Sequence, residues 1–290
     1  MDNLKGKVAV ITGAASGIGR ALALHLAEEG CALAIVDLDG EGLTETRALL
    51  AAYPQQPISY VVDVGDKKQM FSLAKKIARK QGGADLLINN AGIGGLASFQ
   101  ELPMDVFERF MQVNFWSGVY GCKAFLPQLL AKPEAHIVNI SSIEGLIALP
   151  QMAAYTSSKF AVRGFTEVLR LDLRHTHIGV SCVFPGGIKT NIARNAVRLA
   201  REYLEEHPEL AAEMAPRLED VDARVAAFEA YAGTSAADAA KVIIEGVKRR
   251  KWRILIGQDA VAMDELQRTR PEDYQEVLSK IWPKGLDPEW

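Results

Sequence analysis

The chain has 290 residues, a formal net charge of -3 at pH 7 and 49% hydrophobic residues. This length and composition suffice for one α/β domain with a full core, and the slightly negative charge offers no global field that would attract nucleic acid. No stretch reaches the roughly 18 to 20 apolar residues of a membrane span, and the N-terminus lacks a signal-peptide core, so we predict a cytoplasmic protein without a membrane span.

The first predicted strand and helix are joined by a glycine-rich turn. Residues 7–11 read KVAVI, an apolar run typical of a buried strand, and the helical ALALHLAEEG follows the turn. Gly13, Gly17 and Gly19 let the backbone bend tightly and approach a pyrophosphate, whose charge would meet the free N–H groups that begin the helix. A plain loop is the alternative. The position between a strand and a helix favours a dinucleotide-binding turn.

The second predicted strand, residues 32–36, ends at Asp37. An acid at this place in a dinucleotide-binding fold accepts hydrogen bonds from the 2′-hydroxyl of the adenosine ribose and repels a 2′-phosphate. We therefore predict that the cofactor is NAD. The alternative role, a cap on the next helix at 41–52, suits Asp39 better.

Strand and helix patterns continue to alternate through residue 92. A strand at 58–62 ends at Asp63, a helix follows at 66–81, and a strand at 85–88 runs into Asn-Asn-Ala-Gly. We expect Asp63 to be available to the adenine, and the small residues Ala91 and Gly92 to admit the ribose. A parallel sheet with a cofactor along its carboxyl edge would show this regularity.

A long helix is predicted at 104–130, containing Asn114, and Pro127 should end or kink it. A buried strand at 136–140 follows and ends near Ser142, where open α/β sheets place their ligand crevice. The hydroxyl of Ser142 can hydrogen-bond a substrate oxygen there.

The next helix pattern, residues 153–173, begins with Tyr155 and Lys159. Positions four apart share a helical face, so the ammonium can lie beside the phenol and favour its ionised form. A free tyrosine has a pKa of about 10, and a general base works best when its pKa is near the working pH. Many such pairs merely share a helical face. With Ser142 nearby, they predict an acid/base site for an alcohol or a carbonyl.

A sixth strand at 179–184 leads into Pro185 and Gly186, after which the groups around Ile188 and Thr190 can bind the nicotinamide amide. Residues 191–234 are rich in Ala, Glu and Arg and predict a helical insertion. Two readings of this insertion stay open, a helix pair that packs on its own domain or another subunit, and a lid over the substrate.

Beyond the insertion we predict a helix at 236–249, a strand at 253–256 and a helical C-terminal extension at 258–290. The insertion carries a helical stripe, and the extension carries aromatic residues that can pack on the domain or on a second copy. The residues concerned are Leu218, Val221, Val225 and Phe228 in the stripe, and Trp282, Leu286 and Trp290 in the extension.

The cysteines, the histidines and one basic run predict neither a disulfide, a metal site nor a catalytic role. Cys31, Cys122 and Cys182 stand far apart in apolar runs, as buried thiols do, so no disulfide is expected. The histidines are dispersed and predict no metal site; we assign His175 and His177 to capping the helix before them. The basic run at 248–251 is interpreted as a solvated helix end.

The chain resembles the short-chain dehydrogenase/reductase family in the order and spacing of its motifs. These are the turn at 12–19, the Asn-Asn-Ala-Gly segment at 89–92, Ser142, Tyr155, Lys159 and the Pro-Gly pair at 185–186. The resemblance is strong over residues 5 to 190 and looser to residue 256. It implies one Rossmann-type, doubly wound domain over residues 1–290, with a seven-stranded parallel sheet and helices on both faces.

The resemblance also implies roles for the matching positions. Tyr155 would be the acid/base, Lys159 would bind the nicotinamide ribose and lower the Tyr155 pKa, Ser142 would hold the substrate oxygen, and Asn114 would support a proton-conducting water. The full implied set of cofactor-binding residues is Gly13, Ser16, Gly17, Ile18, Gly19, Asp37, Asp63, Val64, Asn90, Ala91, Gly92, Tyr155, Lys159, Pro185, Gly186, Ile188 and Thr190.

These expectations together predict an NAD(H)-dependent oxidoreductase that interconverts a secondary alcohol and a ketone. The expected pocket positions are Gly94, Ile143, Leu149, Met152, Gly187 and the helical stripe of the insertion, which are mostly small or apolar and favour a hydrophobic substrate. We expect Glu144 to face water without a role. A homodimer or homotetramer built on the helices at 104–130 and 153–173 is expected. Two alternatives stay open: a dinucleotide-binding regulatory protein without turnover, and an epimerase or dehydratase of the related extended family.

Overall fold

Seven parallel strands form the central sheet of the computed structural model, which describes residues 1–95, 97–209 and 221–281. Their spatial order is β3-β2-β1-β4-β5-β6-β9, and every neighbouring pair is parallel. The strands are β1 (Val8–Thr12), β2 (Ala32–Asp37), β3 (Ile58–Val61), β4 (Leu86–Asn89), β5 (Ala135–Ile140), β6 (Ile178–Pro185) and β9 (Arg253–Ile256). The predicted fold class is confirmed.

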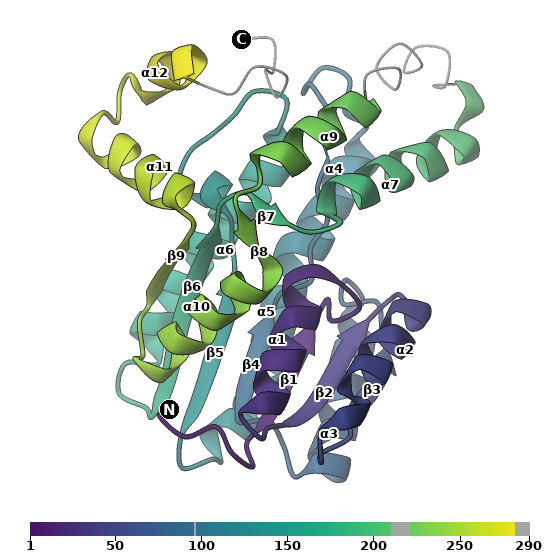
Figure 1. The fold of residues 1–290 in the computed structure, drawn as a ribbon, viewed down its shortest axis with the longest axis vertical. Helices are drawn as coiled ribbons and strands as arrows, with labels where there is room; N and C mark the ends of the chain where they lie inside the picture. The colour runs from purple at the N-terminus through teal and green to yellow at the C-terminus, as the bar shows by residue number, and fades with distance from the viewer. Residues whose placement is uncertain (96, 210–220, 282–290) are drawn as a thin grey trace.

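Helices cover both faces of this sheet (Figure 1). The helices are α1 (Gly17–Glu28), α2 (Gly40–Leu49), α3 (Lys67–Gln81), α4 (Met104–Phe110), α5 (Ser117–Leu130), α6 (Ala153–Asp172), α7 (Ile192–Glu206), α9 (Val221–Tyr231), α10 (Ala236–Lys248), α11 (Gln258–Thr269) and α12 (Tyr274–Ile281). Leu22, Leu43 and Ile243 bring α1, α2 and α10 onto one face, while Met70 and Phe125 bring α3 and α5 onto the other.

The strand order reverses beside β1. From β1 the chain first winds outward through β2 to β3, and then crosses back to β4 on the other side. Val10 of β1 therefore pairs with Ala34 of β2 and with Leu87 of β4. Ligands of open α/β sheets bind beyond the carboxyl ends of the strands at such a reversal, because the two following loops diverge and leave a crevice.

Local sequence accounts for several element boundaries. Asp39 caps α2 by accepting a hydrogen bond from the Gly42 N–H, as predicted, and Asp66 caps α3 in the same way. Gly82 ends α3 with a φ of 73°, a left-handed conformation that glycine adopts without strain.

The predicted helix at 104–130 is wrong in its interior. Residues Met111–Trp116 form a π-helical segment between α4 and α5, and the chain remains helical past Pro127 to Leu130. A π-helical turn adds one residue to the turn, so it changes the direction in which the following side chains point. Asn114 lies within this segment.

The assignment of His177 as a cap on its own helix is also wrong. Helix α6 ends at Asp172, and Nε2 of His177 lies 3.0 Å from the carbonyl oxygen of Leu129. His177 thus meets the last turn of α5 instead, and His175 is exposed. The chain passes the end of α5 before it enters β6. Sequence spacing does not reveal that α5 is a tertiary neighbour of His177.

The described parts of 191–234 and 258–281 are mainly helical. Helices α7 and α9 and the short strands β7 (Ile188–Lys189) and β8 (Thr234–Ser235) lie beyond the carboxyl end of the sheet, and α11 and α12 form the extension (Figure 1). Leu218 and the three tail residues Trp282, Leu286 and Trp290 lie outside the described residues, as does the side chain of Val221. The three cysteines are free and buried.

Candidate active site

Ser142, Tyr155 and Lys159 are brought together where β5 ends and α6 begins. Ser142 follows β5 in an extended conformation, and its Oγ accepts a hydrogen bond of 3.2 Å from the N–H of Glu144. Tyr155 lies in the first turn of α6, half-buried, with the ring of Phe110 edge-on to it at 6.5 Å between centroids. The Tyr155 phenol is within hydrogen-bonding reach of the Ser142 side chain.

Lys159 lies one turn after Tyr155 and is almost completely buried. Its Nζ is 5.5 Å from the centroid of the Tyr155 ring and donates a hydrogen bond of 3.2 Å to the carbonyl oxygen of Ile140. Ser141 fixes the same helix from the strand side, because its Oγ donates to the Lys159 carbonyl oxygen at 2.8 Å. The end of β5 therefore holds the ammonium in place.

The protonation behaviour of Tyr155 differs from the prediction. Burial raises the pKa of Tyr155 above its usual value, the neighbouring Glu144 carboxylate raises it further, and a hydrogen bond with Ser142 opposes both effects. Burial lowers the pKa of Lys159 to about 8. The ammonium does not bring the phenol below its usual pKa here, because burial and the Glu144 charge both oppose ionisation of the phenol.

Asn114 joins this cluster through the π-helical segment. Its Nδ2 donates to the Ser158 Oγ at 3.0 Å and to the Ile93 carbonyl oxygen at 3.1 Å, and its Oδ1 accepts from the Ile93 N–H at 2.8 Å. A Cβ atom built on Gly92 would lie 3.2 Å from the Asn114 Oδ1 and 3.4 Å from the Lys159 Nζ. The glycine therefore keeps open the space between the amide and the ammonium.

The glycine-rich turn forms a cradle at the start of α1. Gly17 has a φ of 54° and lies against Thr190, while a Cβ atom on Gly19 would collide with the carbonyl oxygen of Gly13. The first N–H groups of α1 have no partner inside the helix, so they are available to an anion. The turn thus fits the pyrophosphate of a dinucleotide, because its glycines allow close approach and its N–H groups are free to donate.

Thr12 and Asn90 fasten this turn to the rest of the site. The buried Oγ1 of Thr12 accepts hydrogen bonds from the N–H groups of Asn90 and Ala91 at 3.0 and 3.1 Å. In return, the Asn90 Nδ2 donates to the carbonyl oxygens of Thr12 and Gly13. The ends of β1 and β4 are therefore cross-linked at the strand-order reversal.

The two acids predicted to meet the adenosine have partners within the chain. Asp37 accepts hydrogen bonds from the N–H groups of Ala15 at 2.9 Å and Asp39 at 3.1 Å, which places its carboxylate beside the glycine-rich turn. Asp63 accepts from the Gly65 N–H and pairs with Arg109 at 3.2 Å. Arg109 is a neighbour that the sequence analysis missed.

Three of the other implied cofactor residues are largely covered by the protein. Val64 and Ile188 are buried in the core, and Ile18 packs partly against it, so only their main-chain groups are well placed to meet a cofactor. Ser16 precedes α1, and its side chain makes no capping hydrogen bond.

Asp259 organises the loop after β6, and the sequence analysis missed it. Its Oδ2 accepts hydrogen bonds from the Gly187 N–H at 2.6 Å and from the Tyr231 hydroxyl at 3.2 Å. A Cβ atom on Gly186 would collide with the Asp259 carboxylate. The position of Asp259 after Gly257 in the first turn of α11 indicated a helix start, but not this contact with a loop 72 residues away.

Elements on the far side of the crevice also approach the site. Ile192 at the start of α7 lies against Gly94, at 3.2 Å from a Cβ built there. The Tyr203 hydroxyl of α7 hydrogen-bonds the Asp105 carboxylate of α4. The insertion therefore borders the loop that follows β4.

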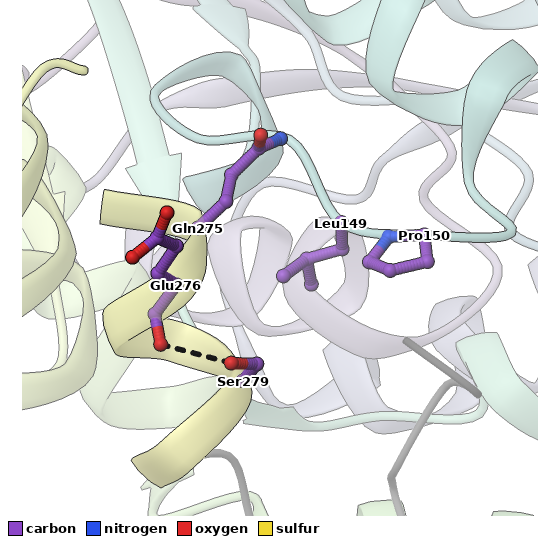
Figure 2. Close-up of a pocket in the computed structure, with 5 residues that line it drawn as sticks. All are labelled: Leu149, Pro150, Gln275, Glu276 and Ser279. Carbon is purple, nitrogen blue, oxygen red and sulfur yellow. Dashed lines mark hydrogen bonds between the residues drawn. The ribbon is translucent and has the colours of Figure 1, made fainter. Parts of the chain in front are cut away.

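An open pocket of about 420 Å³ lies between the loop after Ser142 and helix α12 (Figure 2). Figure 2 shows Leu149 and Pro150 on one side and Gln275, Glu276 and Ser279 of α12 on the other. The Tyr274 hydroxyl accepts a hydrogen bond of 3.1 Å from the Ala148 N–H, which ties α12 to this loop. Of the expected pocket positions, Leu149 lines this pocket.

The expectation that Glu144 faces water is wrong. Only 5% of Glu144 is exposed, and its carboxylate accepts a hydrogen bond from the Thr156 hydroxyl of α6 at 2.5 Å. The short 3₁₀ turn Ile143–Gly145 places it inward, against α6. Sequence reasoning had no signal for this inward turn.

No group of three or more His, Cys, Asp or Glu side chains in residues 1–95, 97–209 and 221–281 is placed to hold a metal ion. Among the helices of those same ranges, none has the length and apolar character needed to cross a membrane.

Comparison with known proteins supports a single family. The family model described as short chain dehydrogenase matches residues 7–201. The SadH protein of Mycobacterium tuberculosis, which carries the name of an oxidoreductase, is 41% identical over 282 residues and 96% of each chain.

Solved structures agree with this result. A short-chain dehydrogenase/reductase from Burkholderia phymatum in complex with NAD has a TM-score of 0.81 and 32% identity, covering 99% of each chain. An NAD⁺-bound xylitol dehydrogenase has a TM-score of 0.62 and 36% identity, covering 64% of this chain and 72% of its own.

Proposed function

Because the chain belongs to the short-chain dehydrogenase/reductase family and is an oxidoreductase of that family, we propose that it interconverts a secondary alcohol and a ketone with NAD. The observation that carries this proposal is the cluster of Ser142, Tyr155 and Lys159 beside the glycine cradle. A hydroxyl donor, an acid/base and a buried ammonium in one crevice suit proton transfer at a carbinol oxygen.

Each residue of the cluster has a distinct task in this proposal. Ser142 holds the substrate oxygen through its hydroxyl, whose orientation is fixed by the Glu144 N–H. Tyr155 takes the hydroxyl proton in oxidation and returns it to the carbonyl oxygen in reduction. When bound, NAD supplies the hydride acceptor and a positive ring charge that favours the phenolate of Tyr155.

Other residues hold the site together. Lys159 binds the nicotinamide ribose, and Asn114 fixes the main chain of Ile93 beside Gly92, where a water can carry the proton outward. The preference for NAD over NADP rests on Asp37, whose negative charge beside the turn at Ala15 repels a 2′-phosphate. Asp63 and the 185–190 loop complete the proposed cofactor site.

A hydrophobic substrate fits the surroundings of the crevice. Ile143, next to Ser142, is almost completely buried, and Leu149 with Pro150 forms the apolar wall of a pocket whose other wall is Gln275, Glu276 and Ser279 of α12. The structural relative named for xylitol acts on a hydrophilic alcohol by its name, so a polyol is the contrasting substrate to compare.

The test is a panel of secondary alcohols assayed by NADH absorbance, with NAD and NADP in parallel. We expect oxidation of medium-chain or cyclic apolar secondary alcohols at higher kcat/KM than xylitol, with NAD preferred. If the protein binds NAD tightly but neither oxidises any alcohol nor reduces any ketone, the regulatory alternative is supported instead.

We also propose that the protein forms a homo-oligomer through α5 and α6. Phe160, Val168 and Leu171 lie on one face of α6 by their spacing, and each is 39% or more exposed. A contiguous apolar stripe on a helix is a common subunit contact. Light scattering should give a mass above the 31.6 kDa monomer, and a monomer at all working concentrations would refute the proposal.

A further inference from the structure

Glu144 is a buried carboxyl group next to the proposed acid/base, and no step of the proposed mechanism uses it. It lies two residues after Ser142, is 5% exposed, and accepts a hydrogen bond from the hydroxyl of Thr156, the residue after Tyr155. Burying a carboxylate away from water is costly unless several donors compensate it. A group kept in such a place at such a cost is a candidate for a functional role.

The geometry lets Glu144 act on the site in two ways. Its main-chain N–H donates to the Ser142 Oγ at 3.2 Å, which fixes the hydroxyl that holds the substrate oxygen. Its carboxyl group is anchored to α6 at Thr156, between the Tyr155 that transfers the proton and the Lys159 that binds ribose. Any change in its charge is therefore felt by both groups, with little water between them.

We propose that Glu144 is a positioning residue whose proton, held or released, sets the pH range in which Tyr155 and Lys159 work. This inference rests on the proposed function for its kinetic consequences, but the burial and titration of Glu144 can be measured without any substrate. The residue would act through the charge that it places beside Tyr155 and Lys159, and it does not touch the reacting atoms.

The direction of each effect follows from the charges. Burial raises the pKa of Glu144 to about 8, against the opposing effects of the Thr156 hydrogen bond and the Lys159 charge. Its carboxylate raises the pKa of Tyr155 and counteracts the burial that lowers the pKa of Lys159. Below about pH 8 Glu144 is therefore protonated and neutral, and as the pH rises its charge opposes ionisation of the phenol and retains the proton of Lys159.

Few other charges on the packed elements compete with this coupling. From α6, Arg163 is paired with Glu167 and donates to the Gly145 carbonyl oxygen. From β6, burial raises the pKa of the Cys182 thiol to about 12, so it stays neutral at working pH. From α11, Asp259 is engaged with Gly187 and Tyr231, and Asp264 is paired with Arg253 and Arg268.

The direct test is infrared difference spectroscopy of the full chain across a pH titration. We expect the carbonyl band of one protonated carboxylic acid to persist at pH 7, to disappear around pH 8, and to be absent from Glu144→Gln. A wild-type protein without such a band at pH 6 would overturn the proposal, whatever the enzyme's substrate proves to be.

The functional test uses the same variant. Glu144→Gln keeps the shape and an acceptor for Thr156 but removes the charge, so the pKa values of Tyr155 and Lys159 should both fall. The rising limb of kcat/KM for oxidation and the alkaline loss of NAD affinity should each move to lower pH by about one unit. Glu167→Gln, a neighbouring acid on α6 whose side chain is 42% exposed, is the matched control and should leave both curves in place.

The outcomes separate this proposal from the proposed function. If Glu144→Gln lowers kcat at every pH without moving either limb, Glu144 is only structural and the proposal fails. If that variant does not fold, Thr156→Val offers a second test, because it removes the hydrogen bond that favours the Glu144 carboxylate. The infrared titration of Glu144 should then move to higher pH. A titration that does not move would equally refute the coupling. An active Tyr155→Phe would refute the proposed function while leaving the Glu144 titration intact.

Discussion

The proposed cofactor half of the crevice is the glycine-rich turn with the ends of β1 and β4, and the proposed substrate side is formed by α7, α9 and α12. Different kinds of contact hold these two regions in place. Around Thr12 and Asn90, buried side chains bond main-chain atoms at fixed points of the sheet. On the substrate side, α7 is held to α9 by Arg194 and Glu229, whose side chains are 64% and 38% exposed. Exposed ion pairs contribute typically no more than about 1 kcal/mol, so the substrate side is less constrained.

This difference explains why the glycine cradle was predictable and the surroundings of the substrate were not. The cradle needs glycines at fixed places after a buried strand, and sequence reveals both the glycines and the strand. The proposed substrate side depends on how α12 lies against Leu149 and on how α7 approaches Gly94, two contacts over long sequence separations. Hydrophobic patterns predict that those helices exist, but not where they pack.

The same contrast appears inside the predicted site. Ser142, Tyr155, Lys159 and Asn114 were found from spacing and resemblance, and the structure brings them together. Glu144 was misplaced because a 3₁₀ turn rotates it inward, and Asp259 was missed because it reaches the site through space alone. Both misses are charged groups whose burial depends on tertiary packing.

The largest expected effect comes from removing the ammonium that joins the two regions. Lys159→Ala should reduce turnover by roughly 10²- to 10⁴-fold and also weaken NAD binding, because we propose that Lys159 binds the ribose and acts beside Tyr155. Steady-state kinetics and NAD titration measure the two losses. Lys123→Ala, on the exposed face of α5, is the control, and unchanged NAD affinity in Lys159→Ala would break the assigned link.

A glycine replacement tests the cradle by itself. Gly19→Ala puts a Cβ atom onto the Gly13 carbonyl oxygen, so NAD affinity should fall tenfold or more, about 1.4 kcal/mol, with a loss of stability as well. Gly118→Ala in α5 meets no atom closer than 3.9 Å and should leave both nearly unchanged. Calorimetric titration and thermal unfolding compare the two variants, and equal behaviour would contradict the role of the turn.

The choice between NAD and NADP should respond to one charge. Wild-type protein should prefer NAD by at least tenfold in kcat/KM, about 1.4 kcal/mol, and Asp37→Ala should narrow that preference by roughly tenfold. The variant also loses the bond to the Ala15 N–H, so Asp37→Asn is the closer replacement and should shift specificity in the same direction. Equal efficiencies with the two cofactors in the wild type would remove the basis of this assignment.

The smallest effect should arise on the substrate side. Leu149→Ser makes the pocket beside α12 more polar and should lower kcat/KM for apolar alcohols by roughly three- to tenfold, with NAD affinity unchanged. Val261→Ser on α11, 45% exposed in the native chain, is the control. If Leu149→Ser instead weakens NAD binding, the division into a cofactor half and a substrate side is wrong.

The central claim is that the phenolic oxygen of Tyr155 transfers the proton, and Tyr155→Phe tests it most directly. The replacement keeps the ring and its contact with Phe110 while removing a single oxygen. With an alcohol that the wild type oxidises, the variant should bind NAD within about twofold of the wild-type affinity and turn over roughly 10²- to 10⁴-fold more slowly. Near-normal turnover with equal NAD binding would contradict the account and assign proton transfer to another group.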